Sequence, residues 1–95
     1  MKLPTAEEMF EETVQKVSSS PEEWLKFLNT ASRVYQYDFD DQLMIYAQRP
    51  NATLCKPYEE WNTEQYRRYV KRGSTGIALF VMNQDKPYLR YVFDV

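Results

Sequence analysis

The stretch YDFDDQLMIYAQRP, residues 37–50, organises the rest of this 95-residue chain. Asp38 is placed to cap a helix, and Asp41 adds a second acid where the positive end of the helix dipole favours one. Pro50 disfavours helical geometry at the residue before it, so the helix ends there. The apolar residues between these signals recur at helical spacing and spread beyond one face: Phe39, Leu43, Met44, Ile45, Tyr46 and Ala47. We therefore predict a central helix over residues 38–49 that is buried on more than one side.

Two amphipathic helices are predicted ahead of the central one. Residues 5–8, Thr-Ala-Glu-Glu, fit a capping box and predict a helix over about 6–18. Residues 20–23, Ser-Pro-Glu-Glu, are a second start signal, with the serine as cap and the proline at the first helical position. The apolar stripe that follows runs at intervals of three and four: Trp24, Phe27, Leu28, Ala31, Val34 and Tyr35. This stripe predicts a helix over about 21–34.

The second half of the chain has the pattern of strands. Residues 51–55 indicate a turn with a short extended piece, and 57–61 a short fourth helix, because a proline is followed by early acids. We expect a strand around 67–70. Residues 77–82 are a near-continuous apolar run typical of a buried strand, and 88–93 return antiparallel to it. The prediction is an α+β fold, with three to four helices packed around the central helix and a small antiparallel sheet in the C-terminal third.

The composition indicates one small domain and excludes several kinds of chemistry. Ninety-five residues support one modest core, so 1–95 is treated as a single domain. The absence of histidine and the presence of one cysteine, Cys55, exclude an intramolecular disulfide, an ordinary zinc site and a Ser-His-Asp triad. We expect no cofactor, no metal and no catalytic residue, and we expect Cys55 to be a small buried residue.

The sequence also has no signal for a membrane or for export. No apolar run approaches the roughly 18 residues that a membrane span requires, and the acidic N-terminal segment is unlike a signal peptide. The chain stops within its last predicted strand, so we expect it to be a piece of a longer protein. We expect a cytoplasmic monomer.

The net charge of −2 conceals an asymmetry between the two halves of the chain. Residues 1–48 carry four basic and nine acidic side chains, a net charge of −5. Residues 49–95 carry eight basic and five acidic side chains, a net charge of +3. One end could therefore attract a polyanion while the other repels it.

A basic segment interleaved with tyrosines lies at 66–72 and leads into a glycine turn at 73–76. The segment contains Tyr66, Arg67, Arg68, Tyr69, Lys71 and Arg72, and the turn is Gly73, Ser74, Thr75 and Gly76. Cations that hold phosphates, with rings that stack on unpaired bases, are typical of single-stranded nucleic-acid binding. A GxxG turn lets backbone amides approach a phosphate closely. A solvated strand and an ordinary strand-joining turn explain the same residues, and both interpretations stay open.

Other candidates lie around the central helix. Four aromatic residues surround its start: Tyr35, Tyr37, Phe39 and Tyr46. We expect Tyr37 to be the most exposed of them, because it lies in the joint between two helices, and Phe39 to belong to the core. Three residues mark the polar edge of the helix: Gln42, Gln48 and Arg49. They could donate to phosphates or bases, although a plain polar face is the simpler explanation. The acids Asp38, Asp40 and Asp41 lack the spacing of a calcium loop, so we expect helix-start acids and no metal site.

Three stretches together resemble the N-terminal domain of ArdC-type antirestriction proteins: 38–53 (DFDDQLMIYAQRPNAT), 58–61 (YEEW) and 68–78 (RYVKRGSTGIA). The closing residues 89–95 (LRYVFDV) resemble the version found at the start of very large proteins of conjugative and mobile elements in Firmicutes. The resemblance covers roughly residues 20–95. It implies binding of single-stranded DNA with little sequence preference, in proteins that accompany DNA transfer. The metalloprotease domain that follows in the family has no counterpart in these residues.

We therefore expect non-catalytic, largely sequence-independent binding of single-stranded DNA. The expected contacts are Tyr37, Gln42, Arg49, Arg67, Arg68, Tyr69, Lys71, Arg72, Gly73, Ser74, Thr75 and Gly76. The alternative is a protein-interaction module that docks a restriction enzyme or other domains of the parent protein. An acidic mimic of DNA is disfavoured, because −2 is far too little charge to imitate a duplex with one phosphate per roughly 1.7 Å. An enzyme is disfavoured because the sequence offers no nucleophile–base or metal set.

Overall fold

The computed structural model describes residues 1–61, 70, 74–83 and 86–94. Its elements in chain order are α1 (Leu3–Val17), α2 (Pro21–Arg33), α3 (Phe39–Gln48), β1 (Cys55–Lys56), α4 (Tyr58–Trp61), β2 (Ile77–Asn83) and β3 (Lys86–Asp94). The predicted α+β class is confirmed, with the helices in the N-terminal part and a three-stranded antiparallel sheet completed by the C-terminal part. None of the helices in the described ranges combines the length and apolar character needed to cross a membrane.

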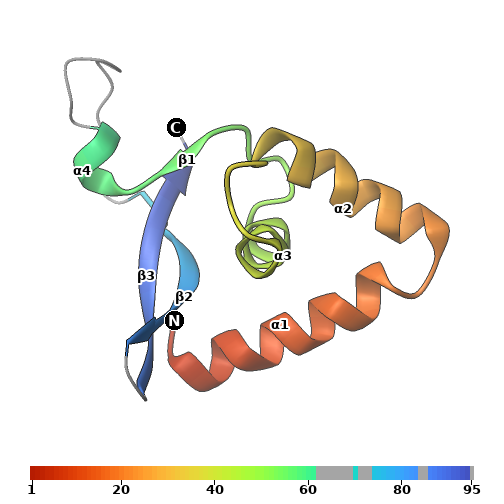
Figure 1. The fold of residues 1–95 in the computed structure, drawn as a ribbon, viewed down its shortest axis with the longest axis horizontal. Coiled ribbons are helices and arrows are strands. Elements are labelled where there is room, and N and C mark those ends of the chain that lie inside the picture. Colours follow the sequence, from red (N-terminus) through yellow and green to blue (C-terminus); the bar gives the residue numbers. More distant parts are fainter. Residues whose placement is uncertain (62–69, 71–73, 84–85, 95) are drawn as a thin grey trace.

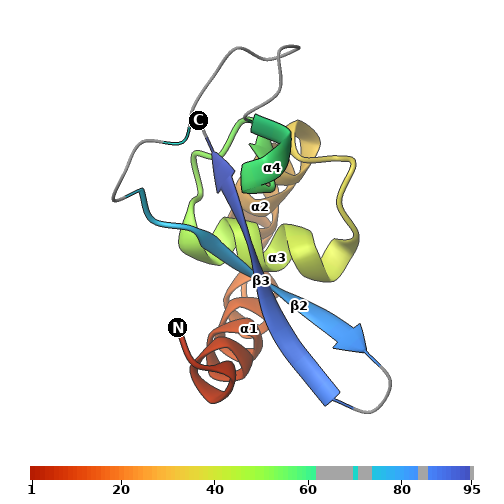
Figure 2. The same ribbon diagram turned by 90° about the vertical axis from the view of Figure 1, so that its left-hand side faces the viewer.

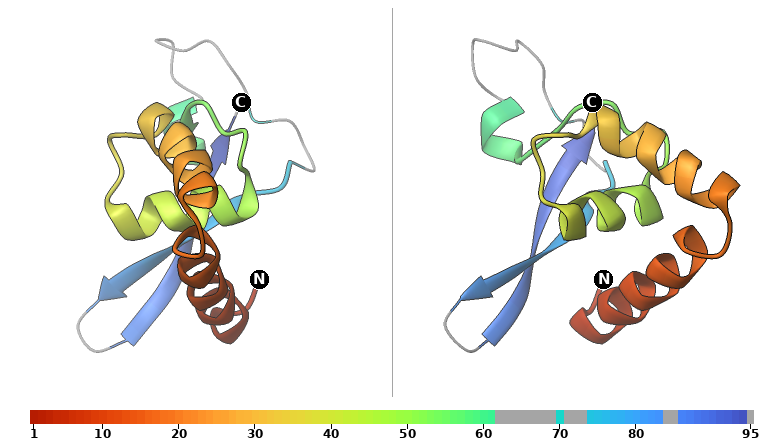
Figure 3. Two further views of the ribbon diagram at one scale, coloured as in Figure 1. Left: turned by 90° about the vertical axis from the view of Figure 1, so that its right-hand side faces the viewer. Right: turned by 45° about the vertical axis from the view of Figure 1, so that its right-hand side comes forward.

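Helix α3 occupies the middle of the fold, as predicted for the central helix. In Figure 1, α1 and α2 form a V that opens toward the sheet, and α3 is seen end-on between them. Figure 3 shows the same arrangement from two further sides, with α2 on one side of α3 and α1 on the other. Met44 and Ile45 belong to a core cluster shared with α1 and the sheet, whereas Leu43 and Tyr46 belong to a second cluster shared with α1 and α2. These four consecutive buried residues explain why the apolar stripe of this helix is so wide.

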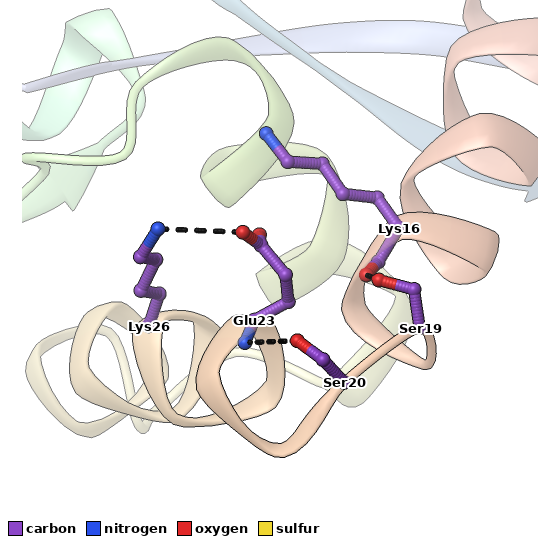
Figure 4. A network of polar contacts seen from close by, with 5 residues as sticks. All are labelled: Lys16, Ser19, Ser20, Glu23 and Lys26. Carbon is purple, nitrogen blue, oxygen red and sulfur yellow. Dashed lines mark hydrogen bonds and ion pairs between the residues drawn. The ribbon is translucent and has the colours of Figure 1, made fainter.

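Capping signals were predicted at the starts of α1 and α2, and the structure confirms one of the two. Ser20 caps α2 as predicted, because its Oγ accepts a hydrogen bond from the backbone N–H of Glu23 at 3.2 Å (Figure 4). The capping box predicted at Thr5 is wrong, since α1 already begins at Leu3, with Lys2 in the cap position. A proline stands in the first turn of α1, where its helical φ is an advantage and its missing N–H would have no partner.

Strand β3 lies between β1 and β2, and both pairings are antiparallel. The β2–β3 pair places Ile77 opposite Val92, which confirms the predicted hairpin, and the hairpin extends past the helices (Figure 2). β1 pairs with the other end of β3, where Cys55 lies opposite Asp94. The short extended piece predicted after the central helix is this strand. The strand predicted at 67–70 falls almost entirely outside the described residues.

Gln48, the last residue of α3, joins the helices to the sheet. Its Nε2 donates to the carbonyl of Ala78 and its Oε1 accepts from the N–H of Ala78, both at 2.9 Å. The same Nε2 donates to the carbonyl of Met44, one turn back in α3, at 3.0 Å. Because β2 is at the edge of the sheet, this side-chain amide occupies the position that a further strand would take. The contact fixes the end of α3 against the start of β2.

The segment between α3 and β1 is held by polar contacts from both sides. From α2, Arg33 donates through Nε to the carbonyl of Ala52 at 2.8 Å and through Nη2 to the carbonyl of Pro50 at 3.0 Å. From β3, Oδ1 of Asp94 accepts from the backbone N–H groups of residues 53 and 54, each at 3.0 Å. These bonds satisfy backbone groups of a segment that lies mostly outside regular structure.

Replacing Gln48 with alanine should lower the free energy of unfolding by about 2–3 kcal/mol, because both backbone groups of the buried Ala78 would lose their partner. Urea denaturation followed by circular dichroism measures the change. Gln15→Ala, at an exposed position of α1, is the matched control and should cost less than about 0.5 kcal/mol. Equal costs for the two substitutions would contradict the role given to Gln48.

Candidate nucleic-acid interface

A groove lies where the end of α3 meets the start of β2 and the middle of β3. Its volume is about 720 Å³, and its lining residues are Met1, Met9, Ala47, Gln48, Arg49, Thr75, Gly76, Ile77 and Tyr91. The contact between Gln48 and Ala78 explains this arrangement, because it places Arg49, which follows α3, near residues 75 and 76, which precede β2. Three residues predicted to bind nucleic acid thus come together from separate parts of the sequence: Arg49, Thr75 and Gly76.

The backbone of Gly76 packs against the ring of Tyr91. A Cβ atom placed on Gly76 would lie 3.1 Å from Cβ and Cδ1 of Tyr91 and 3.3 Å from Cζ of Phe93. Any other residue at this position would therefore press on the Tyr91 side chain. Gly76, the second glycine of the GxxG sequence, thus serves close packing against β3, and it leaves the Tyr91 ring in place beside the groove.

Arg49 brings a positive charge to the groove. Its side chain is partly buried, and among the described residues no carboxylate lies within ion-pair distance of it. Arg90, in contrast, has Asp41 at 3.8 Å. The guanidinium of Arg33 also contacts no carboxylate in the described part of the chain, since it donates only to carbonyls and one hydroxyl. A partly desolvated cation that lacks a counter-charge attracts an anion more strongly than a fully solvated one.

Tyr91 offers the groove an aromatic surface. Its side chain is 41% exposed, whereas its neighbour Val92 is fully buried, as expected where successive side chains of a strand face opposite sides of the sheet. Its hydroxyl donates to the carbonyl of Met1 at 3.4 Å. A half-exposed tyrosine ring is a suitable surface for stacking of an unpaired base.

The other predicted contacts lie elsewhere or outside the described residues. Gln42 donates through Nε2 to the carbonyl of Val34 at 3.4 Å, and the hydroxyl of Tyr37 donates to the carbonyl of Cys55 at 2.6 Å. Neither of these side chains lines the groove. Ser74 is exposed one residue before the groove lining. Six predicted contacts lie outside the described residues: Arg67, Arg68, Tyr69, Lys71, Arg72 and Gly73.

The expectation that Tyr37 is the most exposed aromatic residue near the start of α3 is wrong. Tyr35 is 78% exposed, whereas Tyr37 is partly buried and packs at the edge of the core cluster shared with the sheet. The reason is the Tyr37 hydroxyl, which reaches the carbonyl of Cys55 in β1. Phe39, expected in the core, is 45% exposed although its ring packs on Phe27.

The sequence pattern did not single out Tyr91 or Arg33. For Tyr91 a signal existed, because alternation along β3 places its side chain opposite that of the apolar Val92. For Arg33 no local signal exists. Its partners are the carbonyls of Pro50 and Ala52, which only the folded chain brings to α2.

The acids at the start of α3 lie where the helix dipole favours them. Asp38 is in the cap position but makes no capping hydrogen bond, and Asp40 and Asp41 follow in the first turn. Burial raises the pKa of the Asp41 carboxyl, and the nearby Arg90 guanidinium partly offsets that rise. In the described ranges, no three or more histidine, cysteine, aspartate or glutamate side chains gather as a possible metal site.

No protein-family model, curated protein or solved structure matches this chain. The described residues that line the groove include a cation, an aromatic ring and a hydroxyl, and none of them carries a carboxylate or a thiol. A cation, a hydroxyl and an aromatic ring are groups that can contact a phosphate and an unpaired base.

Burial protects Tyr37 and Cys55 from ionisation. Burial, with a smaller contribution from the charge of Cys55, raises the pKa of Tyr37 from 10.0 to about 12. Burial, with the charge of Asp94, raises the pKa of the Cys55 thiol from 9.0 to about 12. Cys55 is free and fully buried, which confirms its predicted place in the core.

Stability should fall as the pH rises from about 9 to about 12, because both groups ionise more easily in the unfolded chain than in the folded one. Their contribution is complete below the unfolded pKa values and is lost as the pH passes the folded ones. Tyr37→Phe should make the decline shallower, since the contribution of Tyr37 would be lost while that of Cys55 stays.

Urea denaturation at intervals between about pH 7 and about pH 11 measures this dependence on pH. Tyr58→Phe, at an exposed tyrosine of α4, is the matched control for removing a hydroxyl. If Tyr37→Phe and the unmodified protein declined equally, Tyr37 would not be the buried phenol described above.

Proposed function

We propose that this domain binds single-stranded DNA, without catalysis and with little preference for base sequence. The observation that supports the proposal is the groove at the end of α3, where Arg49 has no carboxylate partner among the described residues and Tyr91 is half-exposed. A phosphate would lie against the Arg49 guanidinium, and an unpaired base would stack on the Tyr91 ring. The hydroxyl of Thr75 and the neighbouring backbone would supply further hydrogen bonds.

The chemistry of the groove favours an unpaired strand over a duplex. Bases in a duplex are already stacked on one another, so a tyrosine ring gains little from them. Stacking and phosphate contacts are available to every nucleotide, which accounts for weak sequence preference. The basic half of the chain, with its net charge of +3, would add long-range attraction.

The resemblance to ArdC-type antirestriction proteins supports the same function. On this basis we place the domain in a cytoplasmic protein of a mobile element, where it would act as a monomer on DNA during transfer. The basic segment from Arg67 to Arg72 and the GxxG turn lead directly into the groove in the sequence, so they would extend the contact along the strand.

Binding of a fluorescein-labelled oligo(dT) should weaken steeply with salt, since each phosphate contact contributes about −0.7 to the slope of log K against log salt. Arg49→Gln should make the slope shallower by about 0.7, and Tyr91→Ala should cost about 1–3 kcal/mol of binding free energy. Fluorescence anisotropy over a salt series measures both. Micromolar binding without salt dependence would contradict the proposed phosphate contacts.

Two matched controls separate the groove from general effects of charge and aromatic content. Lys16→Gln removes an exposed positive charge from α1, and Tyr88→Ala removes an exposed ring from the same strand as Tyr91. Both should bind like the unmodified protein. Equal losses for Tyr88→Ala and Tyr91→Ala would show that the groove is not the site.

Charge reversal at Arg68, Lys71 and Arg72 together should remove most of the affinity without unfolding the domain. The physical reason is the loss of three cations next to the groove in the sequence. Anisotropy measures the affinity and circular dichroism the folding. An unchanged dissociation constant would remove the basic segment from the binding surface.

A further inference from the structure

The apolar stripe of α2 is wider than the core requires. The core takes Phe27 and Ala31, which are 2% and 8% exposed. Trp24 and Leu28, one helical turn apart, remain 40% and 41% exposed. An amphipathic stripe that folding buries only in part leaves an apolar surface for another molecule.

Phe39, at the first position of α3, extends this surface. The ring centroids of Trp24 and Phe39 are 6.3 Å apart, and both rings pack on the buried Phe27 at 5.5 Å. We call the surface formed by Trp24, Leu28 and Phe39 the Trp24 face. Because two of its side chains rest on a buried ring, little conformational entropy would be lost when a partner covers them.

A hollow beside Trp24 gives the face some depth. Its volume is about 480 Å³, and it is lined by Val17, Ser18, Ser19, Ser20, Pro21 and Trp24, at the turn between α1 and α2. The dimensions suit an apolar side chain of a partner, anchored next to the tryptophan ring.

The charges around the Trp24 face select a cationic partner. Exposed acids adjoin it in the sequence at Glu22, Asp38 and Asp40, and one exposed cation, Lys16, directly precedes the residues that line the hollow. The cation of this turn of α2, Lys26, is already paired with Glu23 at 3.3 Å (Figure 4). The N-terminal half as a whole carries −5, so a nucleic acid would be repelled here and a basic protein segment attracted.

We infer that the Trp24 face docks a basic amphipathic helix of a protein partner, with apolar side chains against Trp24, Leu28 and Phe39 and lysines or arginines toward the acids. The mode is that of an amphipathic helix laid on a complementary apolar surface. This inference does not depend on DNA binding, because the Trp24 face is at the start of α3 and the groove at its end, roughly 15 Å along the helix axis.

Tryptophan fluorescence can test the inference directly, because the chain has two tryptophans in different settings. Trp61 is 1% exposed and its Nε1 donates to the carbonyl of Phe93, so Trp24 is the one that reports a bound partner. The probe is a synthetic helix of leucine and lysine, about 18 residues long, with the leucines on one face. It should shift the emission to shorter wavelength, and the same composition in scrambled order should not.

Matched variants then locate the site by anisotropy of the labelled peptide. Leu28→Lys should weaken binding about tenfold, whereas Met82→Lys, at an exposed apolar position of β2, should change it less than about twofold. Asp38→Asn with Asp40→Asn should weaken binding about threefold, whereas Glu7→Gln with Glu11→Gln, at exposed positions of α1, should not. Circular dichroism confirms that each variant is folded.

Several outcomes would overturn the inference. Equal binding of the scrambled peptide, or equal effects of Leu28→Lys and Met82→Lys, would show that attraction is general and not at this face. A concentration-dependent dimer that Leu28→Lys abolishes in sedimentation would assign the face to a second copy of the chain. A shift of Trp24 emission by oligo(dT), lost in Leu28→Lys, would assign it to nucleic acid. If oligo(dT) failed to bind at all while the peptide bound as expected, only the proposed DNA-binding function would fail.

Discussion

One side-chain amide fixes the end of α3 against the start of β2. Gln48 ends α3 and bonds both backbone groups of Ala78 at the outer edge of β2, so the helical part and the sheet are joined at a defined point. A buried backbone N–H or C=O without a hydrogen-bond partner lowers stability. The Gln48 side chain satisfies both groups of Ala78, because a side-chain amide is a donor and an acceptor at once. It also explains the groove, since Arg49 must follow Gln48 and residues 75–76 must precede Ala78.

A second set of polar contacts shapes the chain beyond the groove. Arg33 from α2 and Asp94 from β3 hold the segment between α3 and β1 from opposite sides. The Arg33 guanidinium donates its hydrogen bonds mainly to carbonyl groups, and no carboxylate within the described ranges pairs with its charge. In the described part of the chain, Arg33 and Arg49 thus both lack a carboxylate partner.

The two ends of α3 differ in the chemistry that they offer. At its start, Phe39 joins Trp24 and Leu28 in an apolar surface among acids. At its end, Arg49 lies in a groove with Tyr91. The helix is buried along its middle, so only its ends reach the surface. This separation would let a domain of this size bind a polyanion and a cationic protein segment at the same time.

Local signals in the sequence determined much of this protein. The start of α2 after its cap Ser20, the burial of α3 and the β2–β3 hairpin follow from capping chemistry and from apolar spacing, which act over a few residues. The early start of α1 shows how one proline outweighs a neighbouring capping box. Tertiary structure decided the rest. Tyr37 is withdrawn from solvent by the carbonyl of Cys55, and the groove unites Arg49 with Tyr91, because hydrogen bonds and packing between distant residues form only once the chain has folded.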